Sequence, residues 1–391
     1  MILRGTHRVQ QDTIGSGGFG QAGPVTQNSR TAAQGASGLR VLQVMSGAAV
    51  GGIETFFFDA VEALHAAGLA QFVVCRPNVP HRLEKLRALG ISFASASFSK
   101  WWPWSTRTVL ADARTAFKPN LAQFWTGRAA QFAVRGKGYL NIGWFGGYRQ
   151  MKDFTACDDF IGITPDLMRH LQDGGADPAR TVRIHTFAAL PELAPVPVSR
   201  ASLATPDDAP LLLILARLHP KKGVDTLLNA LAKVPGAFLW IAGEGEDRPA
   251  FELLAKSLGI EERVRFLGWR NDRAELLAAA DVCVMPSRFE PFGTVMAEAW
   301  SAGTPLITAA AQGPLAYVKD GINGLMVPID DPLALAAAVR RVISDPALAA
   351  SLVAGGHRTY DESFTRTAYV RQTLTFYRTV LNRVPDTEDG R

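Results

Sequence analysis

The chain has 391 residues, 47% of them apolar, and a formal net charge of +5, which is enough length and apolar content for two domains with separate cores. It has no run of 18 uncharged apolar residues and no amino-terminal apolar signal segment, so we expect neither a membrane-spanning helix nor a secreted protein. Cys75, Cys157 and Cys283 are too widely spaced for a zinc motif, and we interpret them as buried thiols of a cytoplasmic protein.

Residues 1–38 form the first segment, which is rich in Gly, Ser, Gln and Thr and has no hydrophobic period. This composition predicts a disordered amino-terminal tail. Within it, residues 15–20 match the GxGxxG pattern of dinucleotide sites. That pattern needs a strand before it and a helix after it. Both are missing here, so we expect no cofactor, and a Rossmann dehydrogenase would rest on this motif alone.

Residues 39–193 alternate short apolar runs with amphipathic segments. The runs predict strands at 40–46, 71–75, 91–94, 121–125, 139–144, 160–164 and 182–187. Helices are predicted between them, including 53–67, 81–89 and 106–117. This alternation is typical of a parallel sheet covered by helices on both faces, so we predict a doubly wound, Rossmann-like first domain.

Positive charge is concentrated within this first domain. Residues 76–152 contain thirteen Lys and Arg but only two acids, together with five of the eight tryptophans. Cations beside Trp favour an anionic membrane surface or a phosphorylated glycolipid, although a solvated basic face would have the same composition. We expect Trp101, Trp102 and Trp104 in an exposed loop because they flank Pro103, and Trp125 and Trp144 in the core.

The second half of the chain repeats the alternation. Three prolines within 191–197 predict a linker. Strands are then predicted at 211–216, 237–243, 264–267, 282–285 and 305–309. They indicate a second doubly wound domain over 194–358. An amphipathic stretch at 359–381 predicts one terminal helix, within a last segment of 359–391.

Two cations follow the first strand of the second domain. Ligands of doubly wound sheets bind where the strands end, and Arg217 lies at such an end. Lys222 stands directly before Gly223, which opens a helix. Two fixed cations can neutralise a diphosphate without a metal. The alternative is a surface cation pair, the usual setting of Arg and Lys.

Two carboxylates with seven residues between them complete the pattern. Glu290 falls in a loop after the strand at 282–285, and Glu298 falls inside the helix that Gly293 opens. Amides at the start of that helix add partial positive charge. Glu298 lies among apolar and small residues, so its carboxylate needs a hydrogen-bond partner such as a diol, unless it faces solvent. These features predict a site for a nucleotide-diphosphate sugar.

The motifs together support a family. The Glu-x7-Glu pattern of Glu290 and Glu298, the clamp of Arg217 and Lys222, and the loop at 51–54 resemble the retaining, GT-B-fold glycosyltransferases of family GT4 that build bacterial cell-envelope polysaccharide and lipopolysaccharide. The likeness covers roughly residues 39–384. It implies an α/β protein of two Rossmann-like domains facing across a cleft. Residues 39–193 would bind the acceptor and 194–358 the donor, and a terminal helix would cross back.

The resemblance also implies a role for each candidate residue. Arg217 and Lys222 would contact the diphosphate and stabilise charge on the leaving group, with Glu290 beside the donor sugar. Glu298 would bind the ribose hydroxyls. The remaining donor-binding candidates are Gly51, Gly52, Gly243, Trp269, Phe292, Gly293, Thr294 and Val295. Trp269 lies in the region that meets the nucleobase, which we do not assign.

The chain departs from the family in one place. Many members carry a His on a first-domain loop that faces the reacting centre, and the matching stretch at 144–149 contains none. We expect Tyr148, Arg149, Lys152 or the substrate phosphate to act in its place.

These observations predict a glycosyltransferase that uses a nucleotide sugar and no metal. The expected acceptor is a lipid-linked or lipopolysaccharide-type glycan at the inner face of the cytoplasmic membrane. A soluble metabolite or protein acceptor is the alternative. A catalytically silent sugar-binding scaffold is disfavoured by the intact cations and acids. No nucleic-acid partner is expected because no binding motif accompanies the charge.

Overall fold

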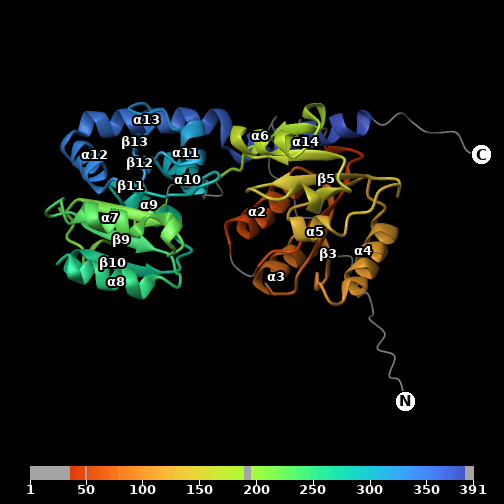
Figure 1. Ribbon diagram of the computed structural model, residues 1–391, viewed down its shortest axis with the longest axis horizontal. Coiled ribbons are helices and arrows are strands. Elements are labelled where there is room, and N and C mark those ends of the chain that lie inside the picture. The colour runs from red at the N-terminus through yellow and green to blue at the C-terminus, as the bar shows by residue number, and fades with distance from the viewer. Residues whose placement is uncertain (1–35, 49–50, 79, 189–194, 384–391) are drawn as a thin grey trace, which may run out of the picture.

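The computed structural model describes residues 36–48, 51–78, 80–188 and 195–383. It contains two parallel sheets, each flanked by helices, which lie side by side in Figure 1. This confirms the predicted α/β architecture with two doubly wound domains. The predicted GxGxxG segment and most of the linker at 191–197 lie outside the described residues.

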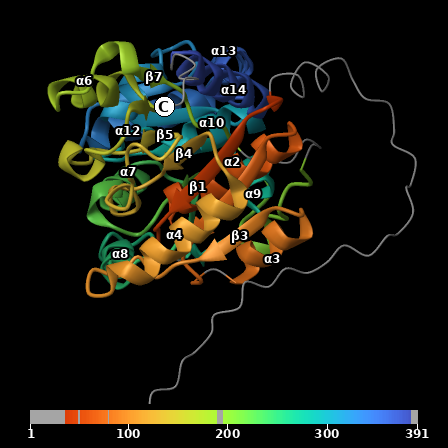
Figure 2. The ribbon, with the colours of Figure 1, turned by 90° about the vertical axis from the view of Figure 1, so that its right-hand side faces the viewer.

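The first sheet has seven parallel strands in the order β3-β2-β1-β4-β5-β6-β7. They are β1 (Arg40–Met45), β2 (Ala70–Cys75), β3 (Ser92–Ser95), β4 (Leu121–Phe124), β5 (Leu140–Phe145), β6 (Asp159–Gly162) and β7 (Thr181–Arg183). The helices are α2 (Gly52–Ala66), α3 (Pro80–Ala88), α4 (Pro103–Phe117), α5 (Gly127–Ala130) and α6 (Pro165–Asp173). Figure 2 looks at this domain from its outer side, with β3 between α3 and α4.

Alternation along the strands of the first sheet builds two cores. Val41 and Met45 pack with α2, whereas Leu42 and Val44 pack with α4 on the opposite face. Successive side chains of a strand point to opposite faces, so apolar residues on both faces of β1 serve both cores. The apolar residues of β1, interrupted only by the buried Gln43, therefore correctly predicted a central strand.

The second sheet has six parallel strands in the order β10-β9-β8-β11-β12-β13. They are β8 (Leu211–Leu215), β9 (Phe238–Ala242), β10 (Val264–Gly268), β11 (Val282–Met285), β12 (Leu306–Ala309) and β13 (Leu325–Val327). The helices are α7 (Val224–Leu231), α8 (Arg248–Ser257), α9 (Arg273–Ala279), α10 (Thr294–Ala302), α11 (Gln312–Tyr317), α12 (Pro332–Ser344) and α13 (Pro346–Ser363). Both sheets reverse their strand order once, between β1 and β4 and between β8 and β11.

The carboxyl-terminal helices join the two domains. The single helix predicted at 359–381 is wrong, because the chain forms the end of α13, breaks at Phe364 and Thr365, and continues as α14 (Arg366–Asn382). Thr365 caps α14 by accepting from the Ala368 amide, so the polar side chain starts a new helix there. Figure 1 shows α13 along the second domain and α14 on the first.

Several contacts fix α14 to the first domain. The Tyr377 hydroxyl donates to Gln123 on β4 at 2.6 Å, and Arg383 pairs with Asp159 at 2.7 Å. The Tyr369 ring lies 5.4 Å from that of Phe56 on α2. Phe56, Tyr369 and Tyr377 belong to one apolar cluster that also contains buried residues of α9 and α10 in the second domain. The crossing terminal helix implied by the family resemblance is therefore present.

The predicted burial of the first-domain tryptophans is confirmed, but the predicted loop is wrong for one of them. Trp125 and Trp144 are buried, and Trp101, Trp102 and Trp104 are 87%, 60% and 57% exposed. Trp104 is not in a loop, however, because Pro103 begins α4. Proline is favoured in the first turn of a helix, where its missing N–H has no partner to lose.

The start of the folded chain also differs from prediction. Ala36 is buried in the first-domain core, and its carbonyl accepts from the Leu39 amide at 3.1 Å. The predicted disordered segment is therefore too long by its last residues, and residues 1–35 lie outside the described part. None of the described helices has both the length and the apolar character needed to cross a membrane.

Candidate active site

The candidate site lies where the second sheet reverses its strand order. β8 and β11 are neighbours, but the chain leaves β8 toward β9 on one side and β11 toward β12 on the other. The loops after these two strands therefore diverge and leave room for a ligand at the carboxyl edge. The loop after β8 carries Arg217 and Lys222, and the loop after β11 carries Glu290.

Lys222 and Glu290 meet across this switch point. Lys222 Nζ lies 2.5 Å from Glu290 Oε2, and the two side chains are 27% and 14% exposed. Ser287 adds a longer contact to the same oxygen at 3.4 Å. Arg217 lies after β8 and is exposed. Its guanidinium forms no hydrogen bond or ion pair with another of the described residues. The structure thus brings one predicted cation to a predicted acid and leaves the other cation open.

Gly223 allows the two loops to approach. Its φ is +66°, and a Cβ there would lie 2.1 Å from the Pro286 carbonyl oxygen after β11. Only glycine tolerates both the left-handed conformation and this backbone contact. Lys222 precedes it as the last residue of a short 3-10 helix, η4 (Pro220–Lys222). The glycine therefore determines where the Lys222 ammonium can reach.

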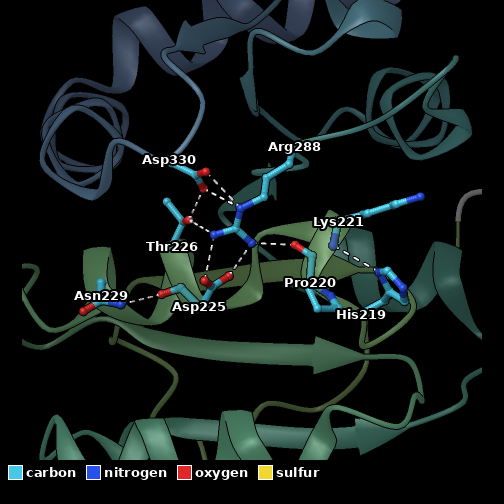
Figure 3. A network of polar contacts seen from close by, with 8 residues as sticks. All are labelled: His219, Pro220, Lys221, Asp225, Thr226, Asn229, Arg288 and Asp330. Carbon is cyan, nitrogen blue, oxygen red and sulfur yellow. Dashed lines mark hydrogen bonds and ion pairs between the residues drawn. The ribbon is translucent and has the colours of Figure 1, made fainter.

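Arg288 fastens the same two loops together (Figure 3). Its guanidinium donates to both carboxylate oxygens of Asp225 at 2.8 and 2.7 Å, and it pairs with Asp330 at 2.7 Å. It also donates to the Pro220 carbonyl, and its own amide donates to the Lys221 carbonyl at 2.9 Å. The hydrogen bonds that Arg288 donates to Asp225 raise the pKa of Arg288, so its guanidinium is a permanent cation at this position.

The start of α10 lies beside Glu290. Gly293 is its N-cap in the left-handed region, with φ +92°, and no side chain caps the helix. Thr294 and Val295 follow as its first residues, and Phe292 is buried beneath the turn. Free amides at a helix start favour an anion, so this turn can add to the charge offered by Lys222.

Glu298 lies deeper in α10 and is almost completely buried, at 1% exposure. Its Oε1 accepts from Arg273 on α9, while Oε2 is buried without a hydrogen-bond partner. Burial raises the pKa of Glu298, and the Arg273 charge opposes that shift. The interpretation of Glu298 as a helix-surface acid is therefore wrong, and one of its oxygens is left with unused acceptor capacity.

Two glycines of the turn at 243–245 pack against the loop that follows β8. A Cβ at Gly243 would meet the Ala216 carbonyl at 1.9 Å, and one at Gly245 would meet that of Leu218 at 2.0 Å. At Gly243 and Gly245 the close approach is therefore between two protein backbones. Trp269 follows β10, is 57% exposed, and donates from Nε1 to Asn271 at 3.2 Å.

The candidates in the first domain are the loop at 51–54 and Tyr148, and of these, within the described residues, only Tyr148 has a contact with the loop after β11. Gly51 caps α2, and Gly52 is its exposed first residue. Glu54 braces the loop, since its Oε1 accepts from the Ala48 amide at 2.9 Å. The Tyr148 ring lies 5.9 Å from that of Phe289, next to Glu290. Tyr148, Arg149 and Lys152 were expected to act in place of the missing His. Among the described residues, Tyr148 is the one of these three that contacts the loop after β11.

Arg273 and the role of Arg288 were missed from the sequence. The burial cost of Glu298 predicted that it needs a partner, but Arg273 lies on another helix and no local pattern connects the two. Arg288 stands two positions before Glu290, yet its partners come from two other elements. Among the described residues, no group of three or more His, Cys, Asp and Glu side chains is placed to hold a metal ion.

Comparisons with known proteins agree on one family. Residues 196–358 match the family described as Glycosyl transferases group 1. The chain is 36% identical over 325 residues to the lipopolysaccharide core biosynthesis glycosyltransferase LpsE of Rhizobium meliloti, covering 81% of this chain and 93% of that one. LpsD of the same organism is 34% identical, with coverage of 81% and 92%.

The fold comparison extends over most of the chain. The crystal structure of Anabaena Alr3699/HepE in complex with UDP and glucose superposes with a TM-score of 0.74 at 19% identity, covering 87% of this chain and 100% of that one. A glycosyltransferase from Rickettsia africae gives a TM-score of 0.77 at 16% identity, covering 89% and 100%. At these identities the likeness shows the fold.

Proposed function

Because this chain belongs to the group 1 glycosyltransferases, we propose that it is a retaining enzyme that moves a sugar from a nucleotide-diphosphate sugar to a lipid-linked or lipopolysaccharide-type glycan. The enzyme class and the GT-B fold follow from the family. The donor, the stereochemical outcome and the acceptor are the proposed part. The retaining outcome is supported by the resemblance of the Glu290 to Glu298 motif to family GT4.

The observation that carries the proposed donor is the meeting of Lys222 and Glu290 at the switch point, 2.5 Å apart. The Lys222 cation, the open side chain of Arg217 and the uncapped start of α10 all follow strand ends at one edge of the second sheet, which supports a diphosphate site there. The acid beside the cation is placed to accept sugar hydroxyls. We propose that these cations take the role of a divalent metal.

The proposed chemistry is a transfer on one face of the sugar. The bond from the anomeric carbon to the leaving phosphate oxygen breaks, and the acceptor oxygen bonds to the same carbon. The acceptor proton passes to the departing diphosphate. Arg217 and Lys222 stabilise the charge that develops on that diphosphate, which is where fixed charges contribute most to rate.

The proposed acceptor rests on two observations. Two relatives of this chain are named as lipopolysaccharide core biosynthesis enzymes. The chain also exposes Trp101, Trp102 and Trp104 in a stretch with few acids. Exposed Trp with nearby Lys and Arg suits an anionic lipid interface. We therefore propose a peripheral enzyme at the cytoplasmic membrane face, with a soluble glycan or protein acceptor as the alternative.

Donor binding can be tested by titration calorimetry with UDP-, GDP- and ADP-sugars. We expect one donor to bind, Lys222→Ala to abolish that binding, and Lys221→Ala to leave it intact. Lys221 is a suitable control because it is an exposed neighbour whose ammonium lies 5.2 Å over the Phe289 ring. If no donor binds, the proposed function is wrong.

Acceptor choice needs a second assay with the donor that binds. Transfer to core-truncated lipopolysaccharide, with octyl glycosides inactive, supports the lipid-linked acceptor. Transfer only to the octyl glycosides supports the soluble alternative. Donor binding without transfer to any acceptor, and without donor hydrolysis, would indicate a sugar-binding scaffold.

A further inference from the structure

Glu298 is a buried acid whose two oxygens have different partners. Oε1 is ion-paired with Arg273, and Oε2 is enclosed without any hydrogen-bond partner among the described residues. An unpaired buried acceptor costs on the order of 1–3 kcal/mol. A protein keeps such an atom where a ligand satisfies it. Oε1 is therefore the anchored oxygen, and Oε2 is the oxygen that can accept a hydrogen bond from a ligand.

Arg273 connects three parts of the molecule. It is the first residue of α9 and follows the exposed loop that carries Trp269. Its side chain is 35% exposed, whereas that of its partner Glu298 is 1% exposed. Asp59, on α2 of the first domain, acts electrostatically with both Arg273 and Glu298. Arg273 is therefore ion-paired with an acid of its own domain and lies within electrostatic range of an acid of the first domain.

We propose that Arg273 is a positioning residue that anchors Glu298 Oε1 and thereby aims Oε2 at the vicinal hydroxyls of the donor's ribose. This inference rests on the proposed function, which supplies the nucleotide donor. A carboxylate oxygen accepts two hydrogen bonds, which suits two adjacent hydroxyls. Without Arg273 the carboxylate is free to rotate, and the geometry that recognises a diol is lost. Arg273 is then the residue that makes the site selective for ribose over deoxyribose.

A purely structural ion pair would behave differently. Its loss would weaken binding of every nucleotide alike, because it would act through the stability of α9 and α10. Loss of a positioning contact weakens the ribonucleotide more than its 2′-deoxy counterpart, which offers Oε2 one hydroxyl fewer. The ratio of the two dissociation constants therefore reports the positioning role, independently of overall affinity.

The charged and titratable groups that face Glu298 also predict how pH acts. They are Arg273 from α9, Asp59 from α2 and Cys283 from β11. Arg273 is the one cation among them, so its removal raises the pKa of Glu298 further. Because the anchor on Oε1 is absent at every pH, raising the pH should deprotonate Glu298 in Arg273→Met without restoring the preference for the ribonucleotide.

The experiment is calorimetry of the whole chain with UDP, GDP, ADP and their 2′-deoxy forms. The wild type should bind one ribonucleotide at least tenfold more tightly than its deoxy form, a difference of about 1.4 kcal/mol. Arg273→Met should bring that ratio close to one, Arg273→Lys should keep part of it, and Glu298→Gln should reduce it. Arg200→Met is the control because it also removes an arginine that pairs with an acid of the same domain, Asp281, at 2.9 Å. It should keep the wild-type ratio.

The outcomes separate the two proposals. If the wild type binds none of the six nucleotides, the proposed function fails. If the wild type discriminates and Arg273→Met weakens ribonucleotide and deoxynucleotide equally, or leaves both unchanged, the positioning role is overturned. A ratio that also collapses in Arg200→Met would overturn it as well, because the effect would then be general to this domain. Melting temperatures of all variants show that each is folded.

Discussion

The Lys222 ammonium and the Glu290 carboxylate form an ion pair that joins the loops after β8 and β11. The cation proposed for the diphosphate is therefore already neutralised by the acid proposed for the sugar. We therefore predict that a donor phosphate has to share Lys222 with Glu290 when it binds. Binding of the diphosphate and release of Glu290 toward the sugar would then be coupled.

Glu290→Gln should change binding and transfer in opposite directions. Without the acid, Lys222 is fully available to phosphate, and nucleoside diphosphate affinity should rise by roughly fivefold, from about 1 kcal/mol. Transfer should fall about a hundredfold or more, because a group that contacts the reacting sugar is altered. Calorimetry and initial rates measure the two effects. Equal losses in both would contradict the coupling.

Arg288→Met should loosen the two loops together. Asp225 and Asp330 lose their shared partner, and we expect unfolding free energy to fall by about 1–3 kcal/mol. Donor KM should rise because the loops no longer hold Lys222 and Glu290 at fixed positions relative to each other. Arg288→Lys keeps the charge but not the bidentate contact, so it should recover only part of the loss. Chemical denaturation and donor titrations measure both quantities.

Arg200→Met again provides the control for the Arg288 prediction. It removes a partly buried arginine of the same domain that contacts Asp281 and the Ala279 carbonyl, away from the site. Its stability should fall while donor KM stays at the wild-type value. A rise of KM in this variant, or an unchanged KM in Arg288→Met, would show that the network does not position the site.

Transfer should continue in excess EDTA, because Arg217 and Lys222 are proposed to stabilise the diphosphate in place of a metal. Initial rates with and without EDTA, and with added Mg²⁺ or Mn²⁺, test this. Activity that disappears with EDTA and returns with either ion would refute the metal-independent mechanism.

Stability should fall with acid partly because of His185. Its ring packs between Tyr317 and Phe364, each with centroids at 5.1 Å, and burial lowers its pKa from 6.5 to about 4. The unfolded chain then binds the proton more readily. The contribution of His185 is complete above pH 6.5 and is lost as pH falls toward 4, with a limit of roughly 3 kcal/mol.

The variant His185→Phe keeps an aromatic ring and removes the titration. Its melting temperature should change less between pH 7 and pH 5 than that of the wild type. His81→Phe, at an exposed position on α3, should retain the wild-type dependence. An equally steep loss in His185→Phe would place the acid sensitivity elsewhere.

Trp101, Trp102 and Trp104 should contribute to binding of anionic vesicles. Each well-placed Lys or Arg contributes about 1 kcal/mol to that attraction, and salt screens it. Co-sedimentation should need anionic lipid, weaken with salt, and drop when the three Trp are replaced by Ser. Leu253→Ser, which alters an exposed apolar residue on α8, should bind as the wild type does. Failure to bind anionic vesicles at low salt would favour the soluble acceptor.

The architecture was predictable because both domains use apolar runs that are buried on two faces. β8 is a sequence of five buried Leu and Ile residues, and such a run is typical of a central parallel strand. The three residues of β13 are too few to show a period. The break between α13 and α14 was hidden because Tyr360, Phe364 and Ala368 recur every four residues, as on one face of a continuous helix.

The candidate site was predictable only in part. Strand ends and helix starts are local features, so Arg217, Lys222, Glu290 and the turn at Gly293 could be assigned to one edge. Pairings between elements are not local. The sequence separates Arg273 from Glu298 by 25 positions and Arg288 from Asp225 by 63, and only the packed helices bring them together.

The return of α14 to the first domain sets an order for biosynthesis. Phe56 packs against Tyr369, and Gln123 meets Tyr377, so the domain translated first lacks part of its core until translation has passed these late residues. At about 5–20 residues per second, roughly 10–40 s separate the synthesis of Phe187 from that of its neighbour Tyr369. During this interval the α2 face remains uncovered on the ribosome, and a fragment that ends before Arg366 keeps it so permanently.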